Sequence, residues 1–265
     1  MALGLSSVSC AAPLMKLPVG PGTPAPDAAD ALAQATAACR SIKTLTAEMA
    51  TTGSAGGRRV RGRLLAGVAA PASVRLEATA PFGPPVFILV ATGNDATLLL
   101  PRDERVLEHG RPDAVLDAVA GVPLDAAELY ATLTGCAPAG SPSSGRTLGA
   151  DWRVVQMSTG PNNYELYLRR DRGAQAWRLV ATTRQGPTDG VVRVEYRDFQ
   201  SGLPRAMHIR GDGFQGTTFD LTLALSQVET NVPLGDDVFR LEIPPSAVPI
   251  TVDELRRARL GLREN

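Results

Sequence analysis

Alternation of apolar and polar residues with a period of two dominates this sequence from residue 44 onward. In 74–79, for example, the apolar Val74, Leu76 and Ala78 are separated by polar neighbours. This pattern is typical of a strand with one buried and one solvated face. It predicts strands near 44–49, 59–64, 74–79, 86–91, 96–100, 104–108, 152–158, 163–169, 176–183, 190–199, 205–210, 217–228 and 238–243. The short connections marked by glycine or proline favour an antiparallel sheet.

A few helices interrupt or flank these strands. The alanine-rich stretch 27–42 predicts one helix that leads into the domain. Pro112 and Gly121 mark the start and end of a second helix. Asp125 with Glu128 forms a capping-box pattern for a third, which ends before Gly135, and a similar pattern at Thr251 starts a last one. The Gly/Pro/Ser-rich stretch 137–145 is interpreted as a linker within one domain.

The predicted fold class is mainly β with short helices, built on one curved antiparallel sheet. So many strands with one apolar face must curl, either into a sandwich or into a barrel that keeps a cavity. Aromatic residues make up 5% of the chain and hydrophobic residues 44%, so the inner face is aliphatic. An aliphatic lining favours acyl chains as ligands.

Charge and lysine content exclude several classes of function. The 27 basic residues balance the 27 acidic ones, which argues against a nucleic-acid partner bound by bulk electrostatics. Lys16 and Lys43 are the only lysines, so Schiff-base chemistry and P-loop nucleotide binding have no support. No cofactor is expected.

The N-terminus resembles the end of a lipoprotein signal. Residues 2–9 are small and apolar and precede Cys10, which we predict to be lipidated; the alternative is a free thiol on a mobile terminus. Residues 11–26 are rich in proline and glycine and predict an extended tether. A single domain over 27–265 follows.

The other two cysteines, Cys39 and Cys136, allow two interpretations. They form one disulfide in an oxidising compartment, or they are two separate small core residues. Neither lies in a CxxC motif or a Cys/His cluster, so no metal site is predicted.

Few residues indicate catalysis. The histidines His109 and His208 lie in unlike contexts, and no G-x-S-x-G elbow is present. The G-x-G-x-x-G match over 211–216 leads into a strand instead of a helix, so we interpret it as a hairpin turn. The chain is not expected to be an enzyme.

Phe82 stands between prolines in a loop that joins two predicted strands. Prolines stiffen the loop and Gly83 permits its turn. Phe82 either folds back over the core or serves as a wedge that inserts into a membrane interface.

Two segments resemble a known family. The stretch RLEATAPFGPPVFILVATGNDATLLLPRDERVLEHGRPDAVLDAVAGVPLDAAELYATLTG and the later GVVRVEYRDFQSGLPRAMHIR are similar to the LolB family of outer-membrane lipoprotein receptors. The tail DDVFRLEIPPSAVPITVDELRRA resembles that of LolA-type carriers. The resemblance implies a half-open barrel with a helical lid, which receives acylated lipoprotein cargo from a LolA-like periplasmic carrier and inserts it into the outer membrane.

This resemblance also implies roles for residues. Phe82 matches the protruding loop used for membrane insertion, and Ala11 after the lipidated cysteine is compatible with sorting to the outer membrane. The expected protein is a monomer, anchored by its lipid and facing the periplasm. The candidate lipid-lining residues, each of which could instead be simple core, are Leu64, Val74, Leu76, Val86, Ile88, Val90, Leu98, Leu116, Val119 and Leu129.

Two other functions remain open at this point. A lipoprotein of the same fold could carry a phospholipid or glycolipid. A lipid esterase is a more distant alternative, and it would depend on one of the histidines.

Overall fold

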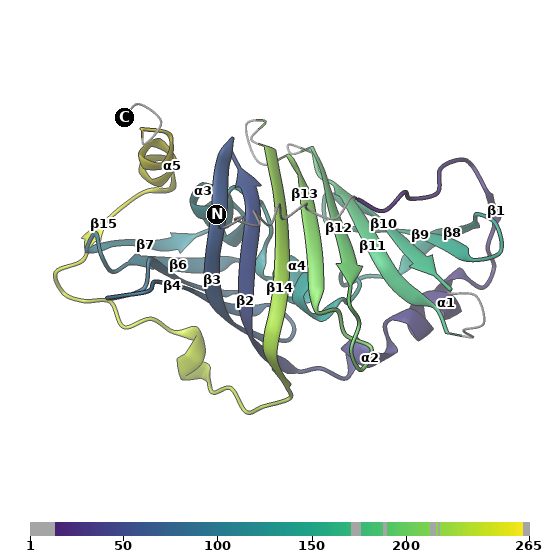
Figure 1. The fold of residues 1–265 in the computed structure, drawn as a ribbon, viewed down its shortest axis with the longest axis horizontal. Helices are drawn as coiled ribbons and strands as arrows, with labels where there is room; N and C mark the ends of the chain where they lie inside the picture. The colour runs from purple at the N-terminus through teal and green to yellow at the C-terminus, as the bar shows by residue number, and fades with distance from the viewer. Residues whose placement is uncertain (1–13, 171–175, 188–189, 213–215, 217, 262–265) are drawn as a thin grey trace, which may run out of the picture.

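The chain forms one large open sheet in the computed structural model, which describes residues 14–170, 176–187, 190–212, 216 and 218–261. The described strands run across the sheet in the order β1-β8-β9-β10-β11-β12-β13-β14-β2-β3-β4-β5-β6-β7-β15 (Figure 1). Their bounds are β1 (Thr23–Pro24), β2 (Thr44–Ala55), β3 (Arg58–Ala69), β4 (Ser73–Thr79), β5 (Phe87–Thr92), β6 (Asp95–Leu100), β7 (Arg105–Gly110), β8 (Pro142–Thr147), β9 (Trp152–Thr159), β10 (Asn162–Arg169), β11 (Arg178–Gln185), β12 (Val191–Arg197), β13 (Ala206–Asp212), β14 (Thr218–Thr230) and β15 (Val248–Pro249). The predicted mainly β fold class with an antiparallel sheet is confirmed.

Pairing is antiparallel between all neighbouring strands except β7 and β15, which are parallel. β14 lies beside β2, although 162 residues separate the end of β2 from the start of β14. This non-local pair joins the two halves of the sheet.

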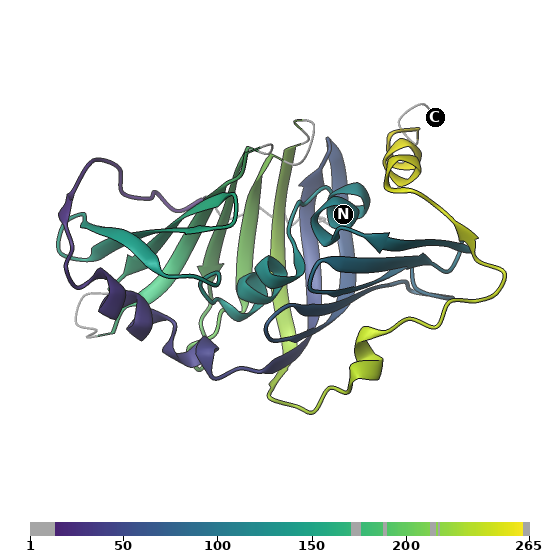
Figure 2. The ribbon, with the colours of Figure 1, turned by 180° about the vertical axis from the view of Figure 1, so that it is seen from behind.

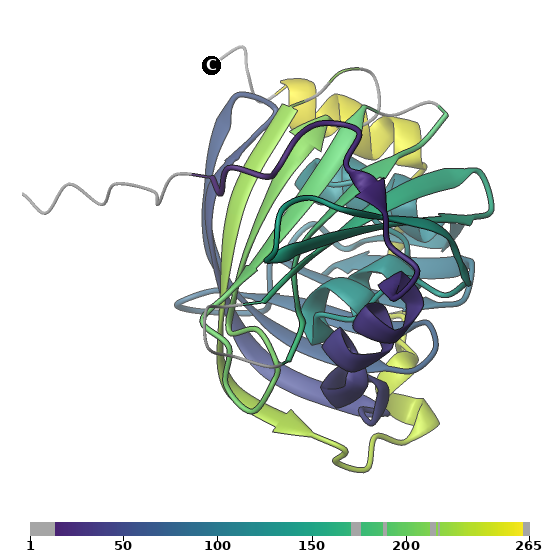
Figure 3. The ribbon, with the colours of Figure 1, turned by 90° about the vertical axis from the view of Figure 1, so that its right-hand side faces the viewer.

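Helices cover the concave face of the sheet. They are α1 (Ala28–Ala35), α2 (Ala37–Arg40), α3 (Pro112–Ala120), α4 (Ala126–Thr134) and α5 (Val252–Gly261). A short 3-10 helix, η2 (Asp236–Phe239), lies instead against the outer side of β4. Figure 2 shows α3 and α4 in front of the strands, and Figure 3 shows the sheet curving round α1, α2 and α4, with β2, β3 and β12–β14 forming the wall on one side of them. α5 packs against α3.

The core lies between the concave face and these helices. Alternate residues of each strand point inward, as the period-two pattern requires. Examples are Val68 of β3, Leu98 of β6, Leu166 of β10 and Met207 of β13, each with no exposed surface. The aliphatic inner face expected from the composition is therefore present.

The predicted strand 238–243 is wrong. The chain there forms η2 and then runs along the convex face of β4, where the Arg75 guanidinium donates to the Val238 carbonyl over 3.2 Å. β4 is already paired on both sides, with β3 and β5. The backbone groups of β4 are therefore already bonded to its neighbours, and residues 238–243 cannot pair with it as a strand despite their alternating pattern.

The predicted linker 137–145 is partly wrong, because β8 begins at Pro142. β8 pairs with β9 on one side and β1 on the other. Gly145 serves close packing instead of a turn, since a Cβ atom at this position would lie 2.1 Å from the Ala28 Cβ atom. Glycine therefore lets α1 lie directly on β8.

The predicted helix 27–42 is two helices. The break falls at Thr36, which has φ −104° and ψ 6°. Its hydroxyl donates to the Leu32 carbonyl over 2.8 Å. Threonine side chains compete for helix carbonyls in this way.

Residues 14–26 are packed against the sheet and do not extend freely as a tether. Thr23–Pro24 form β1, and Met15 and Leu17 pack on a small cluster on the convex face that includes Val154 and Tyr167. The Met15 amide donates to both carboxylate oxygens of Glu195, at 3.0 and 3.1 Å. The folded domain thus begins near residue 14 instead of residue 27, while residues 1–13, including Cys10, lie outside the described residues.

Candidate functional site

Two short helices, α3 and α4, cover the concave face where the sequence places a lipid site. α3 starts with Pro112 at its first turn and ends at Gly121, whose φ is 78°. In α4 the Glu128 amide donates to the Asp125 carboxylate over 2.8 Å, and the Asp125 amide donates back to Glu128 over 3.0 Å. Gly135 ends α4 with φ 69°. Both helices thus begin and end where the sequence predicts.

Seven of the ten predicted lining residues lie in the core between the sheet and the helices. Val74, Leu76, Leu98, Leu116 and Leu129 are buried, and Leu64 and Val119 are partly buried against the same cluster. They come from β3, β4, β6, α3 and α4. The structure therefore brings these seven side chains together, packed on one another.

The other three predicted lining residues lie on the opposite face. In β5, Leu89 pairs with Leu76 and Ala91 with Val74, so the inward set is Phe87, Leu89 and Ala91. The alternate positions, Val86, Ile88 and Val90, therefore face away from the concave core. All residues of 86–91 are apolar, so the sequence does not show which of the two alternate sets is buried.

A buried polar cluster that no local sequence pattern indicates connects α4 to the sheet. The Arg184 guanidinium of β11 donates to both carboxylate oxygens of Glu128, at 3.0 and 2.9 Å. The Tyr164 hydroxyl of β10 donates to the same carboxylate over 2.5 Å. Sequence showed Glu128 only as a capping residue, because its two partners come from strands far along the chain.

Burial sets the proton affinity of this cluster. It raises the pKa of the Glu128 carboxyl, and the positive charge of Arg184 offsets only part of that rise. Burial together with the negative charge of Glu128 also raises the pKa of the Tyr164 hydroxyl far above its usual value. Tyr164 therefore stays a hydrogen-bond donor at physiological pH.

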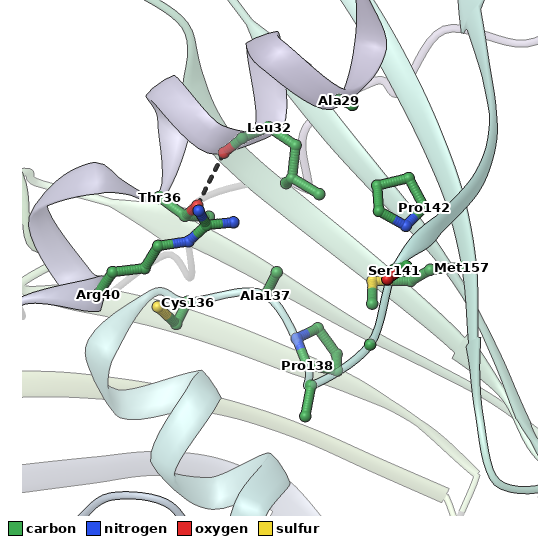
Figure 4. Close-up of a pocket in the computed structure, with 12 residues that line it drawn as sticks. Ala29, Leu32, Thr36, Arg40, Cys136, Ala137, Pro138, Ser141, Pro142 and Met157 are labelled. Carbon is green, nitrogen blue, oxygen red and sulfur yellow. Dashed lines mark hydrogen bonds between the residues drawn. The ribbon is translucent and has the colours of Figure 1, made fainter.

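A pocket of about 470 Å³ opens between α1, α2 and the loop that follows α4 (Figure 4). Apolar side chains make up most of its wall. Its lining residues are Ala29, Leu32, Thr36, Arg40, Cys136, Ala137, Pro138, Ala139, Gly140, Ser141, Pro142 and Met157. We call it the mouth pocket. Arg40 is exposed, and within the described part of the chain no acidic side chain pairs with it.

A second cavity lies next to the mouth pocket, beneath α4. This smaller cavity of about 30 Å³ shares Cys136 and Pro138 with the mouth pocket and reaches Glu128 and Arg184. Cys136 forms a disulfide with Cys39, which is the first of the two interpretations left open by the sequence. This bond joins the end of α4 to α2 beside the pocket.

Phe82 lies on an exposed, braced loop. Its side chain is 90% exposed. Arg102, in the β6–β7 turn, donates to the Phe82 carbonyl over 3.0 Å and to the Pro84 carbonyl over 3.1 Å. Of the two interpretations of Phe82, the one in which it folds back over the core is therefore wrong.

Other candidate residues give no further site. His208 is buried on the convex face, with Nε2 2.6 Å from the Asp220 carboxylate, and His109 lies beside Asp95 at the surface. In the glycine-rich segment 211–216, residues 213–215 lie outside the described part, between β13 and β14. Where the structure is described, no group of His, Cys, Asp and Glu could hold a metal ion, and no helix is long and apolar enough to span a membrane.

This architecture, an open curved sheet that wraps short helices, is the LolA-like fold. Among solved structures, a LolA superfamily protein from Nitrosomonas europaea superposes with a TM-score of 0.57 at 12% identity, over 81% of this chain and 97% of that one. A second, from Vibrio parahaemolyticus, is described as an outer membrane lipoprotein-sorting protein domain; it has a TM-score of 0.52 at 10% identity and covers 80% of this chain and 97% of that one. No protein-family model and no curated protein sequence matches this chain.

Proposed function

We propose that this protein binds acyl chains of lipids or lipoproteins on its concave face and passes lipoprotein cargo to the outer membrane. The proposal rests on the aliphatic inner face of the sheet, which two short helices cover. These helices can move away without breaking hydrogen bonds between strands, which would not be possible if a second sheet covered the face as in a β-sandwich. The fold shared with a lipoprotein-sorting domain supports the same function.

Apolar burial supplies the energy for cargo binding. Each buried methylene contributes about 0.8 kcal/mol, so a long acyl chain is held well by an aliphatic face. A bilayer buries the same chain more completely, and cargo therefore moves to the membrane without a nucleotide. Binding and transfer, instead of catalysis, are proposed for this reason.

The mouth pocket is the proposed entry for the chain. Its volume of about 470 Å³ lies within the range of about 300–1,000 Å³ that is usual for small-molecule sites. Arg40 at the rim offers a guanidinium to an anionic end of the lipid. A phospholipid carrier is the second candidate function, and this arginine is the observation that favours it.

The protein is proposed to act at the outer membrane of the cell envelope. Lipidation of Cys10 would hold the protein at the periplasmic side of the outer membrane, a LolA-like carrier would deliver cargo, and Phe82 would touch the bilayer. The protein is proposed to act as a monomer. The exposure of Phe82 and the bracing of its loop by Arg102 support the membrane contact.

Blocking the mouth pocket tests the proposed binding. Ala29→Trp fills the opening from α1, and Ala33→Trp adds the same ring to an exposed position of α1 outside the pocket lining. We expect Ala29→Trp to weaken binding of a fluorescent fatty-acid probe at least about tenfold, with Ala33→Trp unchanged. Equal binding by both variants and the unaltered protein would exclude the pocket as the entry.

Phe82 variants test delivery separately from binding. Phe82→Glu is expected to keep probe binding and to stop lipoprotein transfer to liposomes, while Phe82→Leu keeps both because it remains apolar. Normal transfer by Phe82→Glu would refute the membrane wedge. Mass spectrometry of lipids that co-purify without detergent distinguishes lipoprotein cargo from a phospholipid.

A further inference from the structure

Three arginines form a row on the convex face of β3. Arg59, Arg61 and Arg63 alternate with inward residues, so all three side chains point away from the core. All three are exposed. In Figure 1, β2 and β3 face the viewer with no helix in front of them. We call these residues the arginine row.

Among the described residues, no acidic side chain pairs directly with the arginine row across the neighbouring strands. On β2, Arg63 pairs with Ala50, Arg61 with Thr52 and Arg59 with Ser54. These partners are small and uncharged. Within the described residues no ion pair involves any of the three arginines. A chain without net charge thus concentrates three unpaired positive charges along one strand.

The row ends beside the loop that carries Phe82. Arg63 pairs with Thr79, the last residue of β4, whose hydroxyl donates to the Arg63 carbonyl over 3.1 Å. Phe82 follows three residues later, so its backbone lies within about 10 Å of Thr79. Charge and an exposed aromatic ring therefore adjoin on one part of the surface.

We infer that the arginine row and Phe82 together form a docking surface for a membrane with anionic lipid headgroups. The guanidinium groups bind phosphates, for which arginine has suitable geometry, and the aromatic ring enters the interface. The membrane contact of Phe82 comes from the proposed function; the charge requirement is new. An RNA or other nucleic acid is less well matched, because no aromatic side chain is interleaved with the arginines.

Vesicle flotation tests this inference. All proteins carry Cys10→Ser in the full chain, so that no lipid anchor contributes. We expect binding to vesicles of phosphatidylglycerol and phosphatidylcholine, little binding to phosphatidylcholine alone, and loss of binding at high salt. Each basic residue near an anionic surface contributes about fivefold, so R59Q/R61Q/R63Q should weaken binding about 100-fold.

Two control proteins make the result specific. K43Q/R240Q/R257Q removes the same number of charges from exposed positions elsewhere and should bind almost as well as the unaltered chain. R59K/R61K/R63K keeps the charge and should retain most binding. The inference would be overturned if R59Q/R61Q/R63Q and K43Q/R240Q/R257Q lost vesicle binding to the same extent. It would also be overturned if R59Q/R61Q/R63Q bound vesicles normally but lost binding to a single-stranded RNA.

Acyl-probe binding separates this inference from the proposed function. R59Q/R61Q/R63Q should bind the fluorescent fatty acid as the unaltered protein does, because the row lies on the face opposite the mouth pocket. If the unaltered protein does not bind the fatty acid but binds anionic vesicles in a way that depends on the three arginines, the proposed lipid site is refuted and the membrane-docking surface is supported.

Discussion

The helices α3 and α4 cover neighbouring parts of the same concave face, but they are held in different ways. α3 directs its buried Asp117 outward to Arg256 of α5, at 3.6 Å, and the Arg256 side chain is 22% exposed. α4 directs Glu128 inward to Arg184, whose side chain is 7% exposed. The disulfide from Cys136 to Cys39 also fixes the end of α4.

The two kinds of attachment indicate which part of the helical cap can move. α3 is held by apolar contacts and by a pair whose arginine is in contact with water. α4 is held by a buried ion pair, a buried hydroxyl and a covalent bond. We therefore expect α3, together with α5, to lift from the sheet more readily than α4, so acyl chains would displace α3 first.

Loss of one carboxylate from each ion pair, Glu128–Arg184 or Asp117–Arg256, should give the largest difference in the free energy of unfolding. Glu128→Leu leaves Arg184 buried without its carboxylate and should lower the free energy of unfolding by about 3–5 kcal/mol. Asp117→Leu leaves Arg256 partly in contact with water and near Asp253, so the loss of stability should be smaller than for Glu128→Leu. Urea denaturation measures both values.

A double variant tests the cause of the Glu128 effect. Glu128→Leu combined with Arg184→Leu removes both charges and should recover much of the lost stability. If the double variant is as unstable as Glu128→Leu alone, the loss comes from packing and not from an unpaired charge.

Removing the disulfide should have the next largest effect. Cys39 and Cys136 are 97 residues apart, and loss of a native disulfide that closes a long loop costs about 2–4 kcal/mol. Cys39→Ser/Cys136→Ser should also speed amide hydrogen exchange in α4 more than in α3. Faster exchange in α3 alone would contradict the proposed difference between the helices.

The smallest expected effect is a pH dependence from Glu128. Its pKa is raised by burial, so the folded protein holds this proton more tightly than the unfolded chain. The free energy of unfolding should therefore fall as pH rises above about 4.3, the usual pKa of a glutamate, toward the pKa of Glu128 in the folded protein. Each tenfold difference in proton affinity is worth about 1.4 kcal/mol.

Glu128→Gln provides the comparison for this pH effect. It cannot ionise, so the stability difference between the unaltered protein and this variant isolates the contribution of Glu128. Urea denaturation across a pH series should show the unaltered protein losing stability relative to Glu128→Gln as pH rises. A difference of the opposite sign would mean that Arg184 outweighs burial.

Much of the fold follows from local patterns. Pro112, Gly121, Asp125 and Gly135 fixed the bounds of α3 and α4, because caps and left-handed glycines act within a few residues. Alternation predicted most strands. It failed at 238–243, where the segment alternates but finds no free strand edge.

The site was less predictable than the fold. Seven lining residues lie in the expected core, but Val86, Ile88 and Val90 were assigned to the wrong face because a continuous apolar run does not reveal its parity. Arg184 was missed altogether, since it lies 56 residues from Glu128 and nothing local links them.

Strands with one aliphatic face can be predicted from the sequence alone, because the period of the side chains is a local property of the backbone. Which charges are buried together under α4, and which arginines on β3 have no acidic partner, can be seen only in the folded chain. Those outcomes depend on strand pairing between distant segments, and pairing is settled by the packing of the whole sheet.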